Sequence, residues 1–280
     1  MIAAAIRWAL AHEASTRTAA LLRICLVPVL WSRWAAELAP HRVGGSALAL
    51  VGLVFYAATA LLLVGLWTRL AAAVVAAVVL VLVYGHGLLL GRPDWLHHHT
   101  YLLAVVSLLL AATPCGRSLS LDRWRALRRA ARGGPPAPRE RANLWGMRLI
   151  ALQLAALYAW SAVDKLTPGF LSGDRLEAIL LVTYFDHGLR AAPWLHLAAL
   201  AGAWLTVLAE LVLGPGLLHP RARRYLLVPG LLLHAAFYVL LPVSTFSVTA
   251  ACMYWAVLDA DRVHAAIDAL LAPPSTAPPA

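Results

Sequence analysis

One stretch of the sequence constrains the fold more than any other. Residues 47–66 read ALALVGLVFYAATALLLVGL, which is apolar on every face of a helix. A helix of about 20 residues is about 30 Å long and matches the hydrocarbon thickness of a bilayer. Strands of a membrane barrel alternate apolar and polar residues instead. The stretch therefore predicts a transmembrane helix.

The composition extends this prediction to the whole chain. Hydrophobic residues make up 62% of it, charged residues only 13%, and the mean hydropathy is +0.76. This is more apolar side chain than one soluble core can bury, so lipid must cover part of it. We predict an all-α, polytopic transmembrane helical bundle without a sizeable soluble domain.

Apolar runs divide the chain into about eight predicted spans. Four of them lie in residues 19–113 and four in residues 147–260, with a cytoplasmic segment 1–18 before them, a basic loop 114–146 between them and a tail 261–280 after them. Pro242 divides the last long run, which could instead be one broken helix. The spans are 19–39, 46–66, 70–90, 96–113, 147–164, 195–214, 225–242 and 244–259.

The basic residues predict how the bundle is oriented. With the N-terminus in the cytoplasm, 17 arginines fall on the inner side, and five arginines and the lysine fall on the outer side. Both termini are then cytoplasmic, and the high Arg and Ala content fits a bacterial inner membrane. The net charge of +10 concentrates in loop 114–146, whose first half predicts a short amphipathic helix on anionic headgroups. We expect no nucleic-acid partner.

The chain contains a single lysine, Lys165, at the end of the fifth predicted span. A long side chain there can snorkel, with its ammonium at the headgroups, and the adjacent Asp164 can pair with it. Arginine snorkels equally well, however, and the chain uses arginine for every other basic residue. A lysine can lose its proton on burial, whereas arginine cannot. Lys165 is therefore a candidate base.

Other polar residues at membrane depth are candidates for the same site. His97, His98 and His99 are successive, so on a helix they point about 100° apart and one of them faces the bundle. Their spacing is not that of a zinc site, and we predict no metal. His234 lies within the seventh span and is either a packing residue or a ligand contact. Ser244 and Thr245 either join helices or line a cavity.

For Glu210 and for the three cysteines the sequence favours a structural role. We predict that Glu210 lies toward the inner half of the sixth span, where it neutralises an arginine such as Arg23. The alternative is a catalytic role. Cys25, Cys115 and Cys252 show no ligand or disulfide spacing and are read as small buried side chains.

Three segments, in this order, resemble one known family. They are the HxTYL entry to the fourth span, YxxSAVDKL around Lys165, and the late LHxxFYxxxPVSTFSVTAACMYWAVL. Together they resemble the HTTM (horizontally transferred transmembrane) family, which is related to the membrane part of vitamin K-dependent γ-glutamyl carboxylase. The resemblance covers roughly residues 15 to 260. Where the carboxylase has two successive lysines, this chain has Asp164 and Lys165.

The resemblance implies a function. A reduced quinone of the vitamin K or menaquinone type would bind in the bundle near the outer leaflet. Lys165 would remove its phenolic proton, with His98 or His99 as the second catalytic residue and His234, Ser244 and Thr245 near the ligand. An epoxidase or carboxylase-like reaction with dioxygen would follow, on a possible peptide or protein substrate.

Two non-enzymatic alternatives stay open. The bundle can be a membrane scaffold or partner subunit for a redox or peptide-modifying enzyme, with the basic loop as its docking surface. A transporter fits less well, because the paired broken helices and multiple intramembrane charges of carriers are missing from the predicted pattern.

Overall fold

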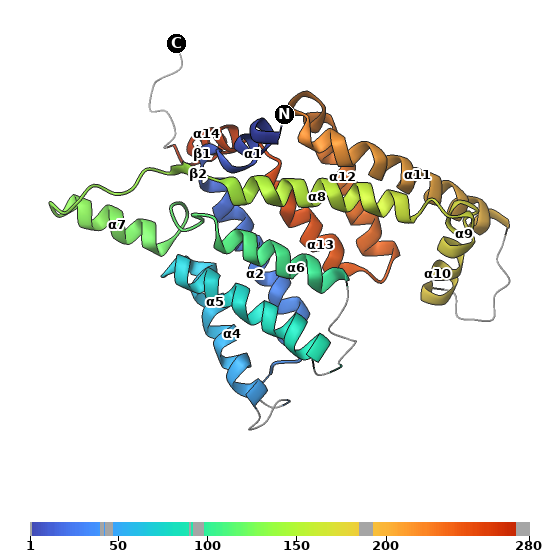
Figure 1. Cartoon of the computed structure of the whole chain (residues 1–280), viewed down its shortest axis with the longest axis horizontal. Helices are drawn as coiled ribbons and strands as arrows, with labels where there is room; N and C mark the ends of the chain where they lie inside the picture. Colours follow the sequence, from blue (N-terminus) through green and yellow to red (C-terminus); the bar gives the residue numbers. More distant parts are fainter. Residues whose placement is uncertain are drawn as a thin grey trace, which may run out of the picture.

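The computed structural model describes residues 2–39, 42, 47–89, 91, 98–184 and 193–272, and these are almost entirely helical (Figure 1). The predicted all-α class is confirmed. The helices are α1 (Ile2–Leu10), α2 (Arg17–Trp34), α4 (Ala47–Val64), α5 (Thr68–Leu80) with its π-helical continuation η1 (Val81–Leu89), α6 (His98–Ala111), α7 (Leu121–Ala131), α8 (Trp145–Asp164), α9 (Pro168–Leu171), α10 (Asp174–Tyr184), α11 (Pro193–Leu218), α12 (Pro220–Leu240), α13 (Ser244–Met253), the 3₁₀ turn η3 (Tyr254–Ala256) and α14 (Ala260–Leu271).

A helix lies within each predicted span, but not all of them have the length and composition of a membrane crossing. Within the described residues, four helices do: α4, α5 with η1, α8 and α11. Helix α6 is apolar but shorter, and α2 carries three arginines in 18 residues. The count of eight crossings stays a prediction.

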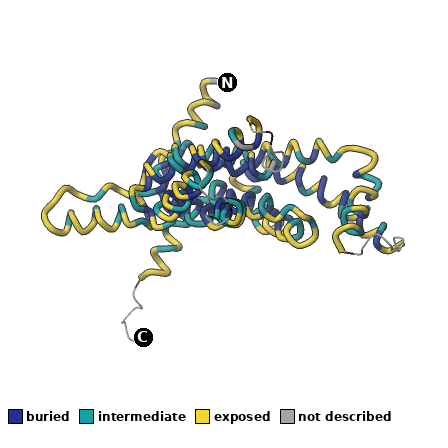
Figure 2. Tube along the Cα trace, turned by 90° about the horizontal axis from the view of Figure 1, so that it is seen from below, coloured by how far each residue is buried: buried dark blue, intermediate teal, exposed yellow. Residues whose placement is uncertain are grey.

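The main hydrophobic core is built mostly from α2, α5, α6 and α8, and α11 packs side by side with α8 (Figure 1). Small residues permit this approach, because a Cβ on Gly214 of α11 would lie 3.2 Å from the carbonyl oxygen of Ala155 in α8. Figure 2 shows buried residues along the centre of the bundle and exposed residues around it. Large apolar side chains are among the exposed ones, as lipid contact requires. Examples are Leu50, Leu53, Leu205, Leu208, Val212 and Leu232.

The run interrupted by Pro242 forms two helices. Helix α12 ends at Leu240 and α13 begins at Ser244, and the two pack against each other. Helix α13 also contacts α2 and α6. The second helix therefore folds back into the bundle, which brings the hydroxyl-rich segment after Pro242 next to other helices.

The cysteines are all free thiols, as expected from their spacing. Cys115 and Cys252 are buried and Cys25 is half-buried. The fold adds a proximity that the spacing did not predict, because α2, which contains Cys25, packs against α13, which contains Cys252.

At one end of the bundle, residues distant in sequence form a clasp. Strand β1 (Glu13–Ser15) pairs antiparallel with β2 (Arg141–Asn143), and α14 packs against β1. The buried Arg17 donates to Glu140 Oε2 (3.2 Å), to Asp268 Oδ1 (2.6 Å) and to the carbonyl oxygen of His264 (2.8 Å). We call this end, with β1, β2, α7 and α14, the basic end.

Asp261 makes this clasp sensitive to acid. Its carboxylate accepts from Arg141 Nη1 (2.6 Å) and from the amide of Ser15 (3.2 Å). The hydrogen bond from Arg141 lowers the pKa of Asp261 below its ordinary value of 3.8. A depressed carboxyl pKa stabilises the fold above the unfolded value, and this contribution is lost as the pH falls through the lower folded value. Protection of the Ser15 amide from hydrogen exchange should therefore fall below pH 3.8.

The substitution Asp261→Asn is the control for this pH effect. It should remove the pH dependence of Ser15 protection and lower the protection at pH 7 only slightly. The change should stay below about 1 kcal/mol, because both side chains of the ion pair are half exposed. A protection step of equal size in the Asn variant would show that another group is responsible.

The opposite end contains two helices in the segment between the fifth and sixth predicted spans. Helices α9 and α10 follow Lys165 directly and fold back on the first half of α11. Phe170 of α9 is buried against Ala203 and Val207 of α11. Gly173, between α9 and α10, has φ of +86° and lies against the backbone of Leu200. We call this end the lysine end.

Candidate functional site

Lys165 lies at the C-terminus of α8 and forms an ion pair with Glu210 of α11. Its Nζ lies 2.9 Å from Glu210 Oε2 and 3.0 Å from Oε1. It also donates to Ser161 Oγ and, at 3.3 Å, to the Ser161 carbonyl oxygen. Ser161 Oγ in turn donates to Glu210 Oε1 at 3.0 Å. An ammonium at a helix C-terminus also interacts favourably with the helix dipole.

The burial of this ion pair is unequal. Glu210 is only 2% exposed, whereas the Lys165 side chain is 21% exposed. A carboxylate this deep needs a charged or hydrogen-bonding partner. Lys165 and Ser161 are those partners, so the carboxylate is neutralised within the bundle. The Lys165 side chain remains partly exposed and can therefore contact a molecule outside the bundle.

The position of Glu210 corrects two readings of the sequence. The partner of Lys165 is Glu210, and Asp164 is exposed at the helix end. Glu210 also does not neutralise Arg23, whose guanidinium donates to the carbonyl oxygens of Leu62 (2.5 Å) and Leu119 (2.6 Å). The antiparallel packing of α8 and α11 explains the difference, because it brings residue 210 level with residue 161.

A second polar cluster lies about 10 Å along α8, two helical turns before Lys165. The Tyr158 hydroxyl lies 2.6 Å from His234 Nε2 and 2.7 Å from the Tyr254 hydroxyl. Tyr158, His234 and Tyr254 are all buried. Gly230 leaves room for this arrangement, because a Cβ there would lie 1.8 Å from the Tyr254 hydroxyl. The glycine therefore sets the position of the cluster.

Aromatic rings surround His234. The ring centroids of Phe246 and Phe237 lie 5.9 and 6.0 Å from that of His234, and the His99 ring centroid lies 5.6 Å from that of Phe246. His234 Nδ1 is buried and has no hydrogen-bond partner within the described residues. A buried ring nitrogen without a partner is costly, so this atom is suited to a hydrogen bond from a ligand.

The structure places the predicted site residues as follows. Lys165 is in the ion pair, and His99 and His234 share Phe246 as a neighbour. His98 is the first residue of α6, and its side chain and all of His97 lie outside the described residues. Ser244 is exposed and Thr245 half-buried at the start of α13, where the Thr245 carbonyl accepts from Thr249. The described contacts do not join Lys165 to His99 or His234.

Sequence reasoning missed Ser161, Tyr158 and Tyr254, and gave Glu210 the wrong partner. A signal existed for two of them. Tyr158, Ser161 and Lys165 are spaced at i, i+3 and i+7, which places them on one face of a helix. Tyr254 and Glu210 come from other helices, so their part in the clusters depends on tertiary packing.

One group of metal-ligand residue types lies at the lysine end. Asp174, Glu177 and His196 have ligand atoms within 4.8 Å of one another. His196 Nδ1 lies 2.6 Å from Glu177 Oε2, and this hydrogen bond ties α10 to α11. That contact accounts for the grouping, and we assign no metal to it.

Comparison with known proteins places the chain in a family. The family model described as HTTM domain matches residues 39–261. The chain belongs to the HTTM domain family. The matched region of this HTTM protein contains Lys165, Glu210 and the His234 cluster, and together with the apolar helices it indicates an integral membrane protein. No curated protein and no solved structure gave a match.

Proposed function

We propose that this HTTM protein is an enzyme in which Lys165 takes a phenolic proton from a lipid-soluble, quinone-type ligand. The observation that carries the proposal is the Lys165–Glu210 pair, in which a half-buried amine faces a deeply buried carboxylate. A deeply buried carboxylate that pairs with a partly accessible amine is a candidate acid–base site. The resemblance to vitamin K-dependent carboxylase points to the same lysine.

The pair holds one proton between two sites. As an ion pair, Lys165 is an ammonium and Glu210 a carboxylate. Transfer of that proton to Glu210 leaves a neutral amine, which can accept a second proton at Nζ from a bound hydroxyl. The ligand then carries one negative charge and the pair one positive charge. Glu210 and Ser161 hold Nζ in place during this transfer.

The His234 cluster supports the ligand assignment. A flat ring that carries oxygens needs aromatic neighbours and a hydrogen-bond partner, and the Phe237 and Phe246 rings with the unpartnered His234 Nδ1 offer both. A reduced quinone, when bound, would supply the phenolic proton and the electrons that reduce dioxygen. His99, whose ring neighbours Phe246, is the proposed histidine partner.

The test uses the purified full chain in nanodiscs under oxygen, with menaquinol or vitamin K hydroquinone, and follows epoxide by mass spectrometry. Lys165→Arg keeps the positive charge but cannot act as a base at neutral pH. Its rate should fall at least about a hundredfold, the usual contribution of a positioned base. Arg33→Lys, which exchanges the same two residue types near the end of α2, should leave the rate unchanged.

The outcomes separate the two classes of function. Epoxide from the parent and the Arg33→Lys variant but not from Lys165→Arg supports a lysine base. Equal rates in Lys165→Arg would exclude that role. If a folded parent makes no epoxide from either quinol, the proposed reaction with a quinone is wrong, and a membrane scaffold becomes the better hypothesis for the function.

A further inference from the structure

Helix α7 is the part of the fold with the least protein around it. It projects from the basic end of the bundle, and none of its residues is buried (Figures 1 and 2). Its apolar side chains Leu121, Trp124 and Leu127 are exposed at helical spacing. A helix of 11 residues with no buried face is marginal in water. Something outside the described residues is therefore expected to cover it.

The helix is nevertheless held in a fixed place. Ser120 caps its N-terminus by accepting from the amide of Arg123 at 2.9 Å. The Asp122 carboxylate accepts from the amides of Trp67 (3.0 Å) and Thr68 (2.8 Å), at the start of α5. These bonds join α7 to the turn between α4 and α5, two helices with the length and composition of membrane crossings. The start of α7 therefore lies next to the turn where α4 ends and α5 begins.

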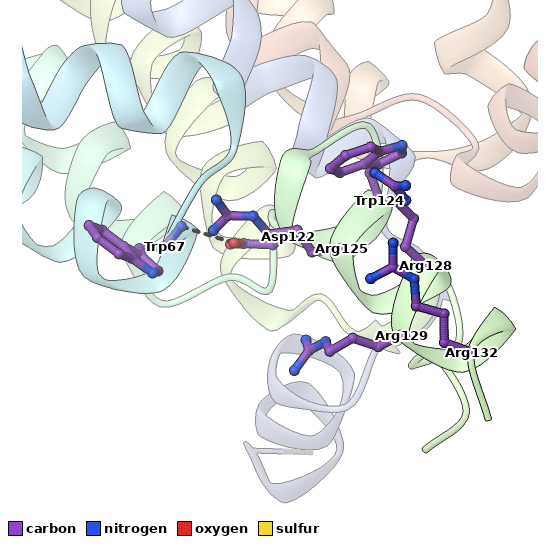
Figure 3. A pocket seen from close by; sticks show the side chains of 7 residues that line it. All are labelled: Trp67, Asp122, Trp124, Arg125, Arg128, Arg129 and Arg132. Atoms are coloured by element: carbon purple, nitrogen blue, oxygen red, sulfur yellow. Dashed lines mark hydrogen bonds between the residues drawn. The ribbon is translucent and has the colours of Figure 1, made fainter. Parts of the chain in front are cut away.

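A cleft of about 570 Å³ opens between α7 and this turn (Figure 3). Four of its seven lining residues are arginines. None of its four arginines has an ion pair within the described residues, and the Arg128 guanidinium stacks on Trp124 at 4.7 Å. The lining residues are Trp67, Asp122, Trp124, Arg125, Arg128, Arg129 and Arg132.

We infer that this cleft binds the phosphate of an anionic membrane phospholipid. Arginine is the preferred partner of phosphate, because its guanidinium donates two parallel hydrogen bonds. Four guanidinium groups against one carboxylate, that of Asp122, leave the cleft with the positive charge that a phosphate diester needs. Basic pockets beside transmembrane helices commonly bind such headgroups. The site does not depend on the proposed reaction at Lys165.

The apolar surroundings favour a lipid over a free anion or an acidic protein. Val64, Trp67 and Leu70, at the facing ends of α4 and α5, are 47%, 61% and 63% exposed. Acyl chains attached to a phosphate in the cleft can lie along these side chains. Tryptophan is also the residue typical of the boundary between headgroups and hydrocarbon. A soluble phosphate or an acidic peptide would leave this apolar surface uncovered.

Native mass spectrometry of the full chain, delipidated in detergent, tests the inference with phosphatidylglycerol and phosphatidylcholine as probes. The parent should retain phosphatidylglycerol in preference. Arg125→Gln with Arg129→Gln should lower that retention about thirtyfold, since each of the two basic residues near an anionic surface contributes on the order of 1 kcal/mol and about 1.4 kcal/mol is a factor of ten. Because α7 has no buried residues, this variant should keep the helical circular dichroism of the parent.

Two controls decide between a lipid and its alternatives. Arg139→Gln with Arg262→Gln removes the same charge from the basic end outside the cleft and should leave retention unchanged. Equal losses in both double variants would overturn the site, because they would reflect net charge alone. Displacement of phosphatidylglycerol by low millimolar inorganic phosphate would overturn the lipid assignment in favour of a free-anion site.

Discussion

Replacing Lys165 with methionine should lower the free energy of unfolding by about 3–5 kcal/mol, the usual cost of leaving one member of a buried ion pair alone. Methionine keeps the volume and the apolar stem but removes the ammonium. Within the described residues, Glu210, at 2% exposure, then keeps Ser161 alone as a hydrogen-bond partner. Unfolding of the purified chain in mixed micelles, titrated with a denaturing detergent and followed by circular dichroism, measures the change.

The double variant Lys165→Met, Glu210→Met shows whether the stranded charge is the cause. Replacing both members of a buried pair with apolar residues is often close to neutral, so this variant should recover most of the loss. Arg141→Met breaks an exposed pair with Asp261 and should cost less than about 1 kcal/mol. A double variant as unstable as Lys165→Met would show that packing, rather than charge, is responsible.

A second large effect is expected at Gly173, at the turn between α9 and α10. Gly173→Ala should destabilise the docking of these helices by about 2–4 kcal/mol, because it combines a left-handed backbone with overpacking. The residue has φ of +86°, and a Cβ there would lie 2.7 Å from the Leu200 amide nitrogen and 2.8 Å from its Cα. Backbone atoms cannot move aside as a flexible side chain can.

Hydrogen exchange of residues 168–184 measures this docking. Exchange should become faster across the whole segment in Gly173→Ala, since α9 and α10 are held to α11 on both sides of the turn. Gly169→Ala is the matched control in the same segment. Nothing lies within 4 Å of a Cβ at Gly169 and its φ is negative, so alanine should be neutral or slightly stabilising there. Equal exchange in the two variants would contradict the steric argument.

Much of the fold could be read from the sequence, because hydrophobic length is a local property. Each apolar run became a helix, and the amphipathic segment after residue 117 became α7. The β1–β2 pairing and helices α9 and α10 were missed. The strands are three residues each and pair across more than 120 positions, and α9 is a single turn whose burial depends on α11. Such elements have no local signal.

The candidate site divides in the same way. Lys165 could be identified because it is the one lysine in a chain that otherwise uses arginine. Its partner could not, because Glu210 lies 45 residues away and only the alignment of α8 with α11 brings the two together. The three successive histidines predicted which end of a span faces the site, but not which ring points into it. Tyr158 shares a helix face with Lys165, whereas Tyr254 had no distinguishing pattern, since tyrosines in apolar spans are common at interfaces.

The clasp at the basic end has a consequence for biosynthesis. Arg17 belongs to the first long helix that the ribosome makes, yet its guanidinium bonds to Glu140, the His264 carbonyl and Asp268. At 5–20 residues per second, roughly 10 to 50 seconds separate residue 17 from residue 268. Glu140 is made about halfway through that interval, but the other two partners follow only with α14. The contacts of Arg17 can therefore be completed only when synthesis is almost finished, and truncation before α14 leaves Arg17 without its last two partners.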